Sequence, residues 1–294
     1  MTTSLTFGTF LAPYHPLGEN PLLSMERDLE IIRYCDELGF NEAWIGEHHS
    51  AAWETVSDPA VFLAVAGERT TRIRLGSGVV SLPYHHPLMV ADRFVQLDYL
   101  TRGRAMLGVG PGALVSDASM MGIEPVTQRG RMEEALGVII RLLNGETVTH
   151  SSDWFELHSA QLQLLPLNGS MPIASTTSPA GMVCAGHHGV GVLSLGAGLI
   201  GGKKDLAAQW ALAEEAAQSE GKVMDRGEWR PVIRAHLAQS RQEAMSQVRE
   251  GRERERELYF RKVAGLRNDH TLEQEIEDDA SIVGTPEDMI DALR

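Results

Sequence analysis

One stretch of the chain concentrates side chains that can carry out chemistry, Trp44-Ile45-Gly46-Glu47-His48-His49. It ends a short strand-like run at Glu42–Gly46, and in parallel α/β folds a site forms from polar residues just past the carboxyl end of a strand. Histidine and glutamate are side chains of proton transfer and of metal binding. A plainer interpretation stays open, in which the three polar groups only form hydrogen bonds at the surface or at the edge of the core. A zinc site is less favoured, because adjacent side chains point apart and neither HxH nor HExxH spacing occurs, so we predict no metal site.

Two glycine-rich turns are the second chemical signal. Gly108-Val109-Gly110-Pro111-Gly112 follows a predicted strand, and Gly196-Ala197-Gly198-Leu199-Ile200-Gly201 matches GxGxxG. A Rossmann dinucleotide site also needs a later strand that ends in Asp or Glu about 20 residues on, whereas Glu220-Gly221-Lys222 is typical of a helix end. The Rossmann alternative is therefore less favoured. We interpret both turns, Gly110 included, as loops in which the backbone approaches a ligand or another strand closely.

The composition limits the possible partners and compartments. Acidic residues number 40 against 26 basic ones, which gives a net charge of −14. So acidic a chain repels nucleic-acid phosphates and anionic membranes. The cysteines, Cys35 and Cys184, form no CxxC pattern, which argues against a disulfide framework and suits a reducing cytoplasm. With no signal-like N-terminus and no apolar run of ~20 residues, we expect a soluble cytoplasmic protein without membrane or nucleic-acid partners.

Short apolar runs alternate with longer amphipathic segments along the chain, and this alternation predicts a parallel α/β fold. The predicted strands are Leu5–Leu11, Glu42–Gly46, Ile73–Val80, Arg104–Val109, Pro172–Ser175, Val190–Leu195 and Pro231–Leu237. Predicted helices begin near Ser24, after an Asp58 cap, and at Met89, Arg129, Pro179, Lys203, Ser240 and Thr285. The turn-rich segment Gly145–Leu165 interrupts the alternation and predicts a small β insertion.

Seven strand–helix units follow from this pattern. They fit a doubly wound parallel sheet, and they fit equally a (β/α)₈ barrel that lacks one unit. Periodicity alone does not choose between the two architectures.

Five motifs together carry a resemblance to a known family. They are Phe7–Leu11, Glu47-His48-His49, Leu75–Pro83 with His86-Pro87, Gly103-Arg104, and Val283-Gly284-Thr285-Pro286-Glu287. In order and spacing, over nearly its whole length, the chain resembles the bacterial-luciferase-like flavin monooxygenases. Within that family the stretch Gly8–Pro16 looks closest to limonene 1,2-monooxygenases. The resemblance implies an α/β fold of the TIM (β/α)₈-barrel type, forming a single domain over residues 1–294.

The resemblance also implies a cofactor and its site. Reduced FMN (FMNH₂) would bind at the carboxyl-terminal mouth of the barrel and react with O₂ to form a flavin C4a-hydroperoxide. His48 would be the catalytic residue, stabilising the peroxide by a hydrogen bond and steering proton transfer, while His49 would be structural. Gly78-Val79 falls where the family has a non-prolyl cis peptide packed on the flavin ring. Gly78, without a side chain, would leave room for the ring.

The flavin phosphate would be held by groups that begin two helices. Arg129 matches a family arginine at the start of the fourth helix. Ser175, Thr176, Thr177 and Ser178 precede the fifth and would add hydroxyl and backbone N–H donors. A simple helix cap is the alternative for these four, and both roles are compatible. Pro111 stands where luciferases carry a further phosphate-contacting arginine.

The family continues past the Gly-Thr-Pro-Glu helix into an eighth strand and helix, whereas this chain stops at Arg294. We therefore expect a barrel that lacks its eighth βα unit. Its edges at Leu5–Leu11 and Pro231–Leu237 would be unpaired and would favour a homodimer or higher homo-oligomer. The resemblance further implies a separate NAD(P)H:flavin reductase as partner. The substrate would be small and apolar, such as a cyclic terpene-like alkene that is epoxidised.

Three other functions stay open. A deazaflavin-dependent oxidoreductase of the same broad fold would transfer hydride without using O₂. A non-catalytic flavin-binding relative would suit an incomplete barrel. A metal-dependent barrel hydrolase would need more ligands at strand ends than the sequence offers.

Overall fold

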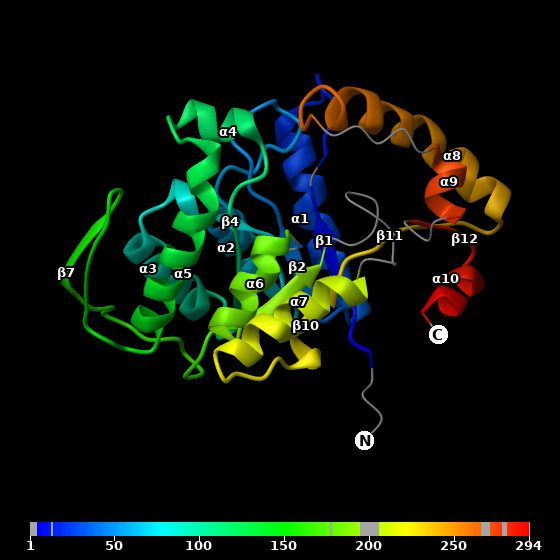
Figure 1. Cartoon of the computed structure of the whole chain (residues 1–294). Helices are drawn as coiled ribbons and strands as arrows, with labels where there is room; N and C mark the ends of the chain where they lie inside the picture. The colour runs from blue at the N-terminus through cyan, green and yellow to red at the C-terminus, as the bar shows by residue number, and fades with distance from the viewer. Residues whose placement is uncertain are drawn as a thin grey trace. The chain divides into compact units, whose positions relative to one another are not determined.

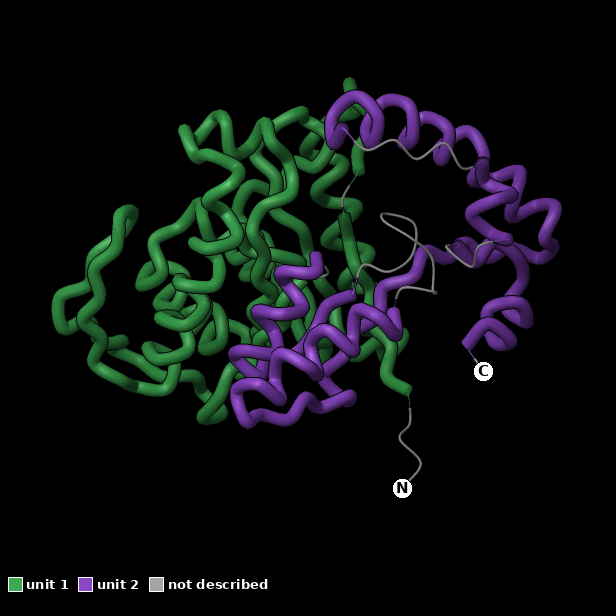
Figure 2. The backbone as a smooth tube through the Cα atoms, viewed as in Figure 1, with its two compact units in different colours: residues 1–176 green, residues 177–294 purple. Residues whose placement is uncertain are grey.

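The computed structural model describes residues 5–12, 14–176, 178–194, 206–265, 271–277 and 281–293. The chain divides into two compact units, residues 1–176 and 177–294 (Figure 2). The predicted GxGxxG turn, Gly196–Gly201, lies outside the described residues, and so does Thr177.

The first unit is built on a parallel sheet. Its strands neighbour one another in the order β1 (Gly8–Leu11), β2 (Glu42–Ile45), β3 (Arg74–Ser77), β5 (Ala105–Gly110) and β8 (Ile173–Thr176). The short strand β4 (Val80–Ser81) also pairs with β5. Every one of these pairings is parallel. The carboxyl ends of the strands therefore gather on one edge, where residues of several loops can meet.

Helices follow the strands as the alternation predicts (Figure 1). They are α1 (Pro21–Leu38), α2 (Pro59–Arg69), α3 (Pro87–Leu100), the short α4 (Val115–Met120) and α5 (Gln128–Leu143). Asp58 caps α2 as predicted, accepting hydrogen bonds from the N–H groups of Ala60 at 3.0 Å and Val61 at 3.3 Å, and Pro59 occupies the first turn. A 3₁₀ turn at Leu82–Tyr84 links β4 to α3.

Trp44 of β2 sets the packing of the sheet. A Cβ atom added to Gly76 of β3 would lie 2.5 Å from Cε3 of the Trp44 ring. A Cβ at Gly108 of β5 would lie 1.9 Å from the carbonyl oxygen of Ser77. Both distances are far below van der Waals contact, so glycine is required here for close packing. The close-approach interpretation of the Gly108–Gly112 turn is confirmed at this position.

The predicted β insertion is an antiparallel hairpin, β6 (Val148–Ser151) and β7 (Glu156–Ala160), which extends away from the helices of the first unit (Figure 1). Glu134 of α5 contacts the turn end of the hairpin. The Glu134 carboxylate accepts from Trp154 Nε1 at 2.6 Å and lies 2.8 Å from His150 Nε2. Phe155 of the same turn also contacts the ring of His86 before α3, so the hairpin is a local addition held by contacts at its turn.

The second unit comprises further alternating elements. They are α6 (Pro179–His188), β9 (Gly191–Ser194), α7 (Leu206–Ser219), β10 (Trp229–Pro231), β11 (Arg234–Leu237), α8 (Arg241–Arg254), α9 (Leu272–Glu277), β12 (Ser281–Gly284) and α10 (Pro286–Ala292). Strand β9 pairs with β10 and β11 pairs with β12, both in parallel. Ser240 caps α8 and Thr285 caps α10, as predicted.

Two strand predictions need correction, and one strand was not predicted. Ile73–Val80 is not one strand, because a cis peptide bond between Gly78 and Val79 separates β3 from β4. Pro231–Leu237 is likewise two segments that pair with different partners, β9 and β12. The sequence analysis also missed β12, which is only four residues long. Strand β12 pairs with one side of Arg234–Leu237, and the prediction that this segment keeps an unpaired edge stays a prediction.

Candidate active site

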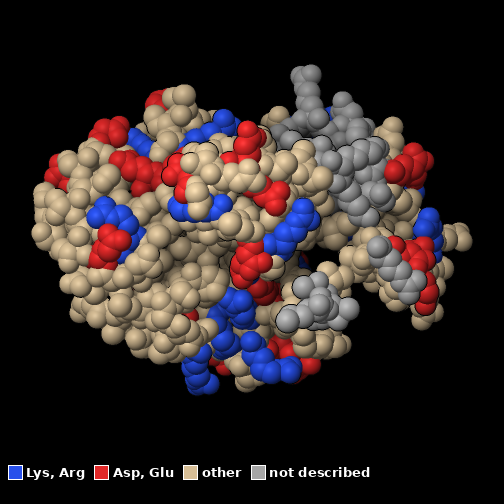
Figure 3. Space-filling view, turned by 60° about the horizontal axis from the view of Figure 1, so that its bottom comes forward, with Lys and Arg blue, Asp and Glu red and all other residues tan. Residues whose placement is uncertain are grey.

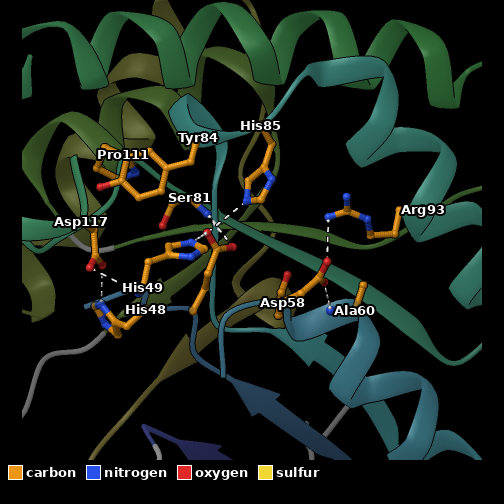
Figure 4. Close-up of polar contacts among 12 residues, drawn as sticks. His48, His49, Asp58, Ala60, Ser81, Tyr84, His85, Arg93, Pro111 and Asp117 are labelled. Carbon is orange, nitrogen blue, oxygen red and sulfur yellow. Dashed lines mark hydrogen bonds and ion pairs between the residues drawn. The ribbon is translucent and has the colours of Figure 1, made fainter. Parts of the chain in front are cut away.

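The loop that leaves β2 carries Glu47, whose side chain is completely buried. One oxygen, Oε1, lies 2.9 Å from His49 Nε2 and 3.0 Å from His85 Nε2, while Oε2 accepts from the backbone N–H of Ser81 at 3.3 Å (Figure 4). Burial raises the pKa of Glu47, but the hydrogen bonds from the two histidines outweigh burial and hold the pKa below its usual range. Glu47 is therefore an ionised carboxylate that joins the loop after β2 to β4 and to the turn that follows it.

Glu47, His49 and His85 also form a group that could hold a metal ion. Within the described part of the chain, the ligand atoms of Glu47, His49 and His85 all lie within 4.8 Å of one another, close enough for one ion. However, both histidine nitrogens contact one carboxylate oxygen at ordinary hydrogen-bond lengths. We interpret the cluster as a hydrogen-bonded network, and the prediction of no metal site stays a prediction.

His48 points to different partners from His49. Its Nδ1 lies 3.1 Å from Asp117 Oδ2, and its Nε2 lies 3.1 Å from Glu54 Oε2. The His48 side chain is 15% exposed, against 2% for Asp117 and 5% for Glu54. Burial lowers the pKa of His48, but the hydrogen bond to Asp117 and the charge of Glu54 outweigh it, so the pKa is raised. Among these three side chains, the His48 imidazole between its two carboxylates is the most exposed.

Asp117, at the start of α4, organises this loop. Besides His48 it accepts hydrogen bonds from the backbone N–H of His49 at 3.2 Å and from the Ser50 hydroxyl. Burial raises the pKa of Asp117, but the hydrogen bonds from His48 and Ser50 prevail and lower it. Asp117 is therefore ionised, and it holds both adjacent histidines through separate contacts.

Several residues predicted to bind the cofactor come together beside this network. The Gly78–Val79 peptide bond is cis, as expected. A Cβ on Gly78 would lie 2.6 Å from Cε2 of Phe10, and one on Gly110 would lie 2.6 Å from Cγ2 of Val79 and 3.2 Å from Oγ1 of Thr176. The carboxyl ends of β3, β5 and β8 therefore meet at a surface of glycine backbone, apolar side chains and one hydroxyl.

The predicted phosphate-binding residues that the structure describes lie on different elements. Arg129 is exposed in the first turn of α5, whereas its neighbour Gln128 is buried. Ser175 is fully buried, and Ser178 belongs to the second unit, where it caps α6 through the N–H of Gly181 at 3.0 Å. The capping alternative is thus confirmed for Ser178. The phosphate role of Arg129 stays a prediction.

Sequence reasoning missed four groups at this edge of the sheet. They are Glu54, Tyr84, Asp117 and Gln128. Gln128 Nε2 donates to the Pro111 carbonyl at 2.7 Å and to the Tyr84 hydroxyl at 3.0 Å, and burial raises the pKa of Tyr84 to about 12. The available signal was the position of Asp117 shortly after the Gly108–Gly112 turn, where strand-end polar residues are expected.

Comparison with known proteins adds an independent observation. The family model described as "Luciferase-like monooxygenase" matches residues 5–294. The chain belongs to the luciferase-like monooxygenase family. It is 48% identical to 4-hydroxyprotoasukamycin monooxygenase of Streptomyces nodosus subsp. asukaensis, over 99% of this chain and 81% of that protein. It is also 48% identical to limonene 1,2-monooxygenase of Rhodococcus erythropolis, over 83% of this chain but only 64% of that protein.

Solved structures of luciferase-like monooxygenases share the fold. Monooxygenase RslO1 from Streptomyces bottropensis superposes with a TM-score of 0.87 at 26% identity, covering 98% of this chain and 87% of that one. A second structure is the oxygenating constituent of 3,6-diketocamphane monooxygenase from Pseudomonas putida, a type II Baeyer–Villiger monooxygenase solved in complex with FMN. It superposes with a TM-score of 0.81 at 25% identity, covering 97% of this chain and 86% of that one. The predicted family, barrel-type α/β fold and monooxygenase class of enzyme are confirmed. Among the described residues, no helix is long and apolar enough to cross a membrane.

Proposed function

We propose that this luciferase-like monooxygenase uses FMNH₂ and O₂ to insert one oxygen atom into a small apolar substrate. The observation that carries the proposal is the position of His48. It is a partly accessible imidazole between two carboxylates at the carboxyl edge of the sheet, beside the surface formed by Gly78, Val79, Gly110 and Thr176. Reduced FMN would supply the electrons that activate O₂. His48 would donate a hydrogen bond, and then a proton, to oxygen.

The residues at the site suit the two ends of FMN. Phe10 and Val79 present apolar surface beside glycine backbone, as a flat ring system requires. Arg129 is exposed in the first turn of a 16-residue helix, where a guanidinium and the helix dipole both favour a phosphate dianion. Ser175 and Thr176 lie at the end of β8 and would add donors, as would Ser178 and Thr177. In support, a solved relative at 25% identity was obtained in complex with FMN.

For the substrate we propose a limonene-like cyclic alkene, converted to an epoxide. The balanced reaction is alkene + O₂ + FMNH₂ → epoxide + FMN + H₂O. Because each turnover consumes one FMNH₂, a separate NAD(P)H:flavin reductase would regenerate it. The relative that acts on limonene and the one that acts on 4-hydroxyprotoasukamycin are equally similar in identity. Both compounds should therefore be tested. Homodimerisation or higher homo-oligomerisation stays part of the proposal.

The first experiment separates the cofactors. The protein is titrated with FMN, riboflavin and deazaflavin F420, and reduced forms are then mixed with substrate with and without O₂. We expect FMN to bind best and product to require O₂. Product formed anaerobically with reduced F420 would replace the proposal by hydride transfer. Flavin binding without turnover of any tested substrate would favour the non-catalytic alternative.

A further inference from the structure

Both nitrogens of the His48 ring face carboxylates. Nδ1 lies 3.1 Å from Asp117 Oδ2, and Nε2 lies 3.1 Å from Glu54 Oε2. A ring nitrogen makes a favourable contact with an ionised carboxylate only when it carries hydrogen, and a neutral imidazole carries one hydrogen on one nitrogen. With both carboxylates ionised, two such contacts at once require the imidazolium form. His48 differs in this from His49, whose one carboxylate contact is made through Nε2.

The two carboxylates hold the ring in different ways. The contact with Asp117 is a hydrogen bond, and Asp117 is itself fixed by the His49 N–H and the Ser50 hydroxyl. The contact of Nε2 with Glu54 is an ion pair. Glu54 lies in the loop after β2, and its backbone forms an isolated β-bridge with Tyr14. Asp117 thus has two further contacts that hold it in place, and we assign Nε2 as the nitrogen from which a proton leaves.

We propose that Asp117 and Glu54 are positioning residues that hold His48 as an imidazolium, Asp117 fixing the ring through Nδ1 and Glu54 retaining the proton on Nε2 until oxygen takes it. The inference rests on the proposed function, in which His48 is the proton donor. The proton leaves Nε2 for the oxygen atom that ends as water, the electrons come from reduced flavin, and solvent returns a proton to the ring. His48 is therefore unchanged over one turnover.

The charges around His48 agree with this arrangement. Glu54, Asp117 and Glu47 are the acidic groups that act on the ring, and His49 is the nearby basic one. Burial alone lowers the pKa of His48, and the three acidic groups together reverse that effect. Removing one carboxylate while keeping the shape of its side chain should consequently move the His48 titration toward lower pH.

The test is an NMR titration of the resting protein, labelled with ¹³C at histidine Cε1, with the His48 signal assigned from its loss in His48→Gln. We expect wild-type His48 to titrate above ordinary histidine and to do so at lower pH in Glu54→Gln and in Asp117→Asn. Glu54→Asp, which keeps the charge, should restore much of the shift. Glu156→Gln is the matched control. It removes a carboxylate 3.4 Å from His158, an exposed pair on the β7 hairpin, and should leave His48 unchanged.

The second readout is the pH profile of product formation with FMNH₂. If His48 must be protonated for the reaction, activity falls about tenfold per pH unit above the pKa of His48. The alkaline side of the pH profile of the Glu54→Gln variant should therefore move to lower pH by as much as its NMR titration does. Circular dichroism and thermal melting establish that each variant is folded, and Glu54→Asp gives a second folded test if Glu54→Gln is not.

The outcomes separate the two proposals. A His48 titration at or below the ordinary histidine value in the wild type, or one unmoved in both Glu54→Gln and Asp117→Asn, would overturn the imidazolium clamp. If the NMR titration moves but the pH profile of oxygenation does not, the clamp is supported and the proton-donor role of His48 in the proposed function is rejected.

Discussion

Replacing His48 should separate catalysis from cofactor binding. His48→Ala removes the donor to oxygen, and losing one such preorganised hydrogen bond typically costs about 3 kcal/mol in the transition state, or roughly a hundredfold in kcat. The substitution also leaves Asp117 and Glu54 buried without their shared cation. Their side chains are only 2% and 5% exposed, so breaking this ion pair should destabilise the fold by roughly 3 kcal/mol or more.

The stability loss should depend on pH with a definite sign. The pKa of His48 is raised on folding, so its contribution is fully present below the unfolded pKa of about 6.5 and is lost as pH rises through the folded pKa. The pKa of Asp117 is lowered, so its contribution is present above about 3.9 and is lost as pH falls through the folded value. The difference in unfolding free energy between wild type and His48→Ala should therefore be largest between pH 4 and 6.5, estimated from these unperturbed values.

The assay combines urea unfolding at several pH values with FMN titration and product analysis. We expect FMN affinity close to that of the wild type, product formation reduced about a hundredfold, and reducing equivalents diverted to H₂O₂. His48→Gln, which keeps a neutral polar side chain, controls for the loss of volume. Oxygenated product at an undiminished rate in both variants would refute the catalytic role, and a stability difference independent of pH would refute the ion pair.

Three further predictions follow from other parts of the structure. Arg129→Ala should weaken FMN binding much more than riboflavin binding by calorimetry, because only FMN carries the phosphate; equal weakening would make Arg129 structural. Asp58→Ala should lower the unfolding free energy by about 1 kcal/mol, since the cap of α2 is lost, and no change in the urea midpoint would contradict this. In hydrogen exchange, β11 should be protected by β12, whereas β1, which pairs with β2, should exchange faster than β5 between β3 and β8. Rapid exchange throughout β11 would argue against its pairing.

Much of the fold could be predicted because local signals agree with it. Asp58 before Pro59 marks the start of α2, and the strand at Glu42–Ile45 ends where its sequence turns polar. The short strand β12 was missed because four residues carry little periodicity, and its partner β11 lies more than forty residues away. Pairing between such distant segments is a tertiary property that no local pattern reports.

The site was only partly predictable for the same reason. His48 and Gly78-Val79 were found because their motifs are contiguous. Glu54 and Asp117 hold His48 from separate loops, and Asp117 is 69 residues from it along the chain. Gln128 is buried and Arg129 is exposed because the two side chains leave α5 in different directions. Which of the two faces the core depends on the rotation of α5 about its axis, and the local sequence does not determine that rotation. The number of charged side chains, in contrast, follows directly from the composition. On the face drawn in Figure 3, both acidic and basic side chains lie at the surface.

The central claim is that this chain transfers one atom of O₂ to an apolar substrate at the expense of FMNH₂. Its most direct test is a reaction under ¹⁸O₂ with a flavin reductase, FMN and NAD(P)H, using limonene and 4-hydroxyprotoasukamycin as substrates and mass spectrometry of the products. We predict one ¹⁸O atom in the product, at one equivalent of FMNH₂ consumed, and little product from His48→Ala. Product oxygen derived from water, or product formed without O₂, would contradict the account.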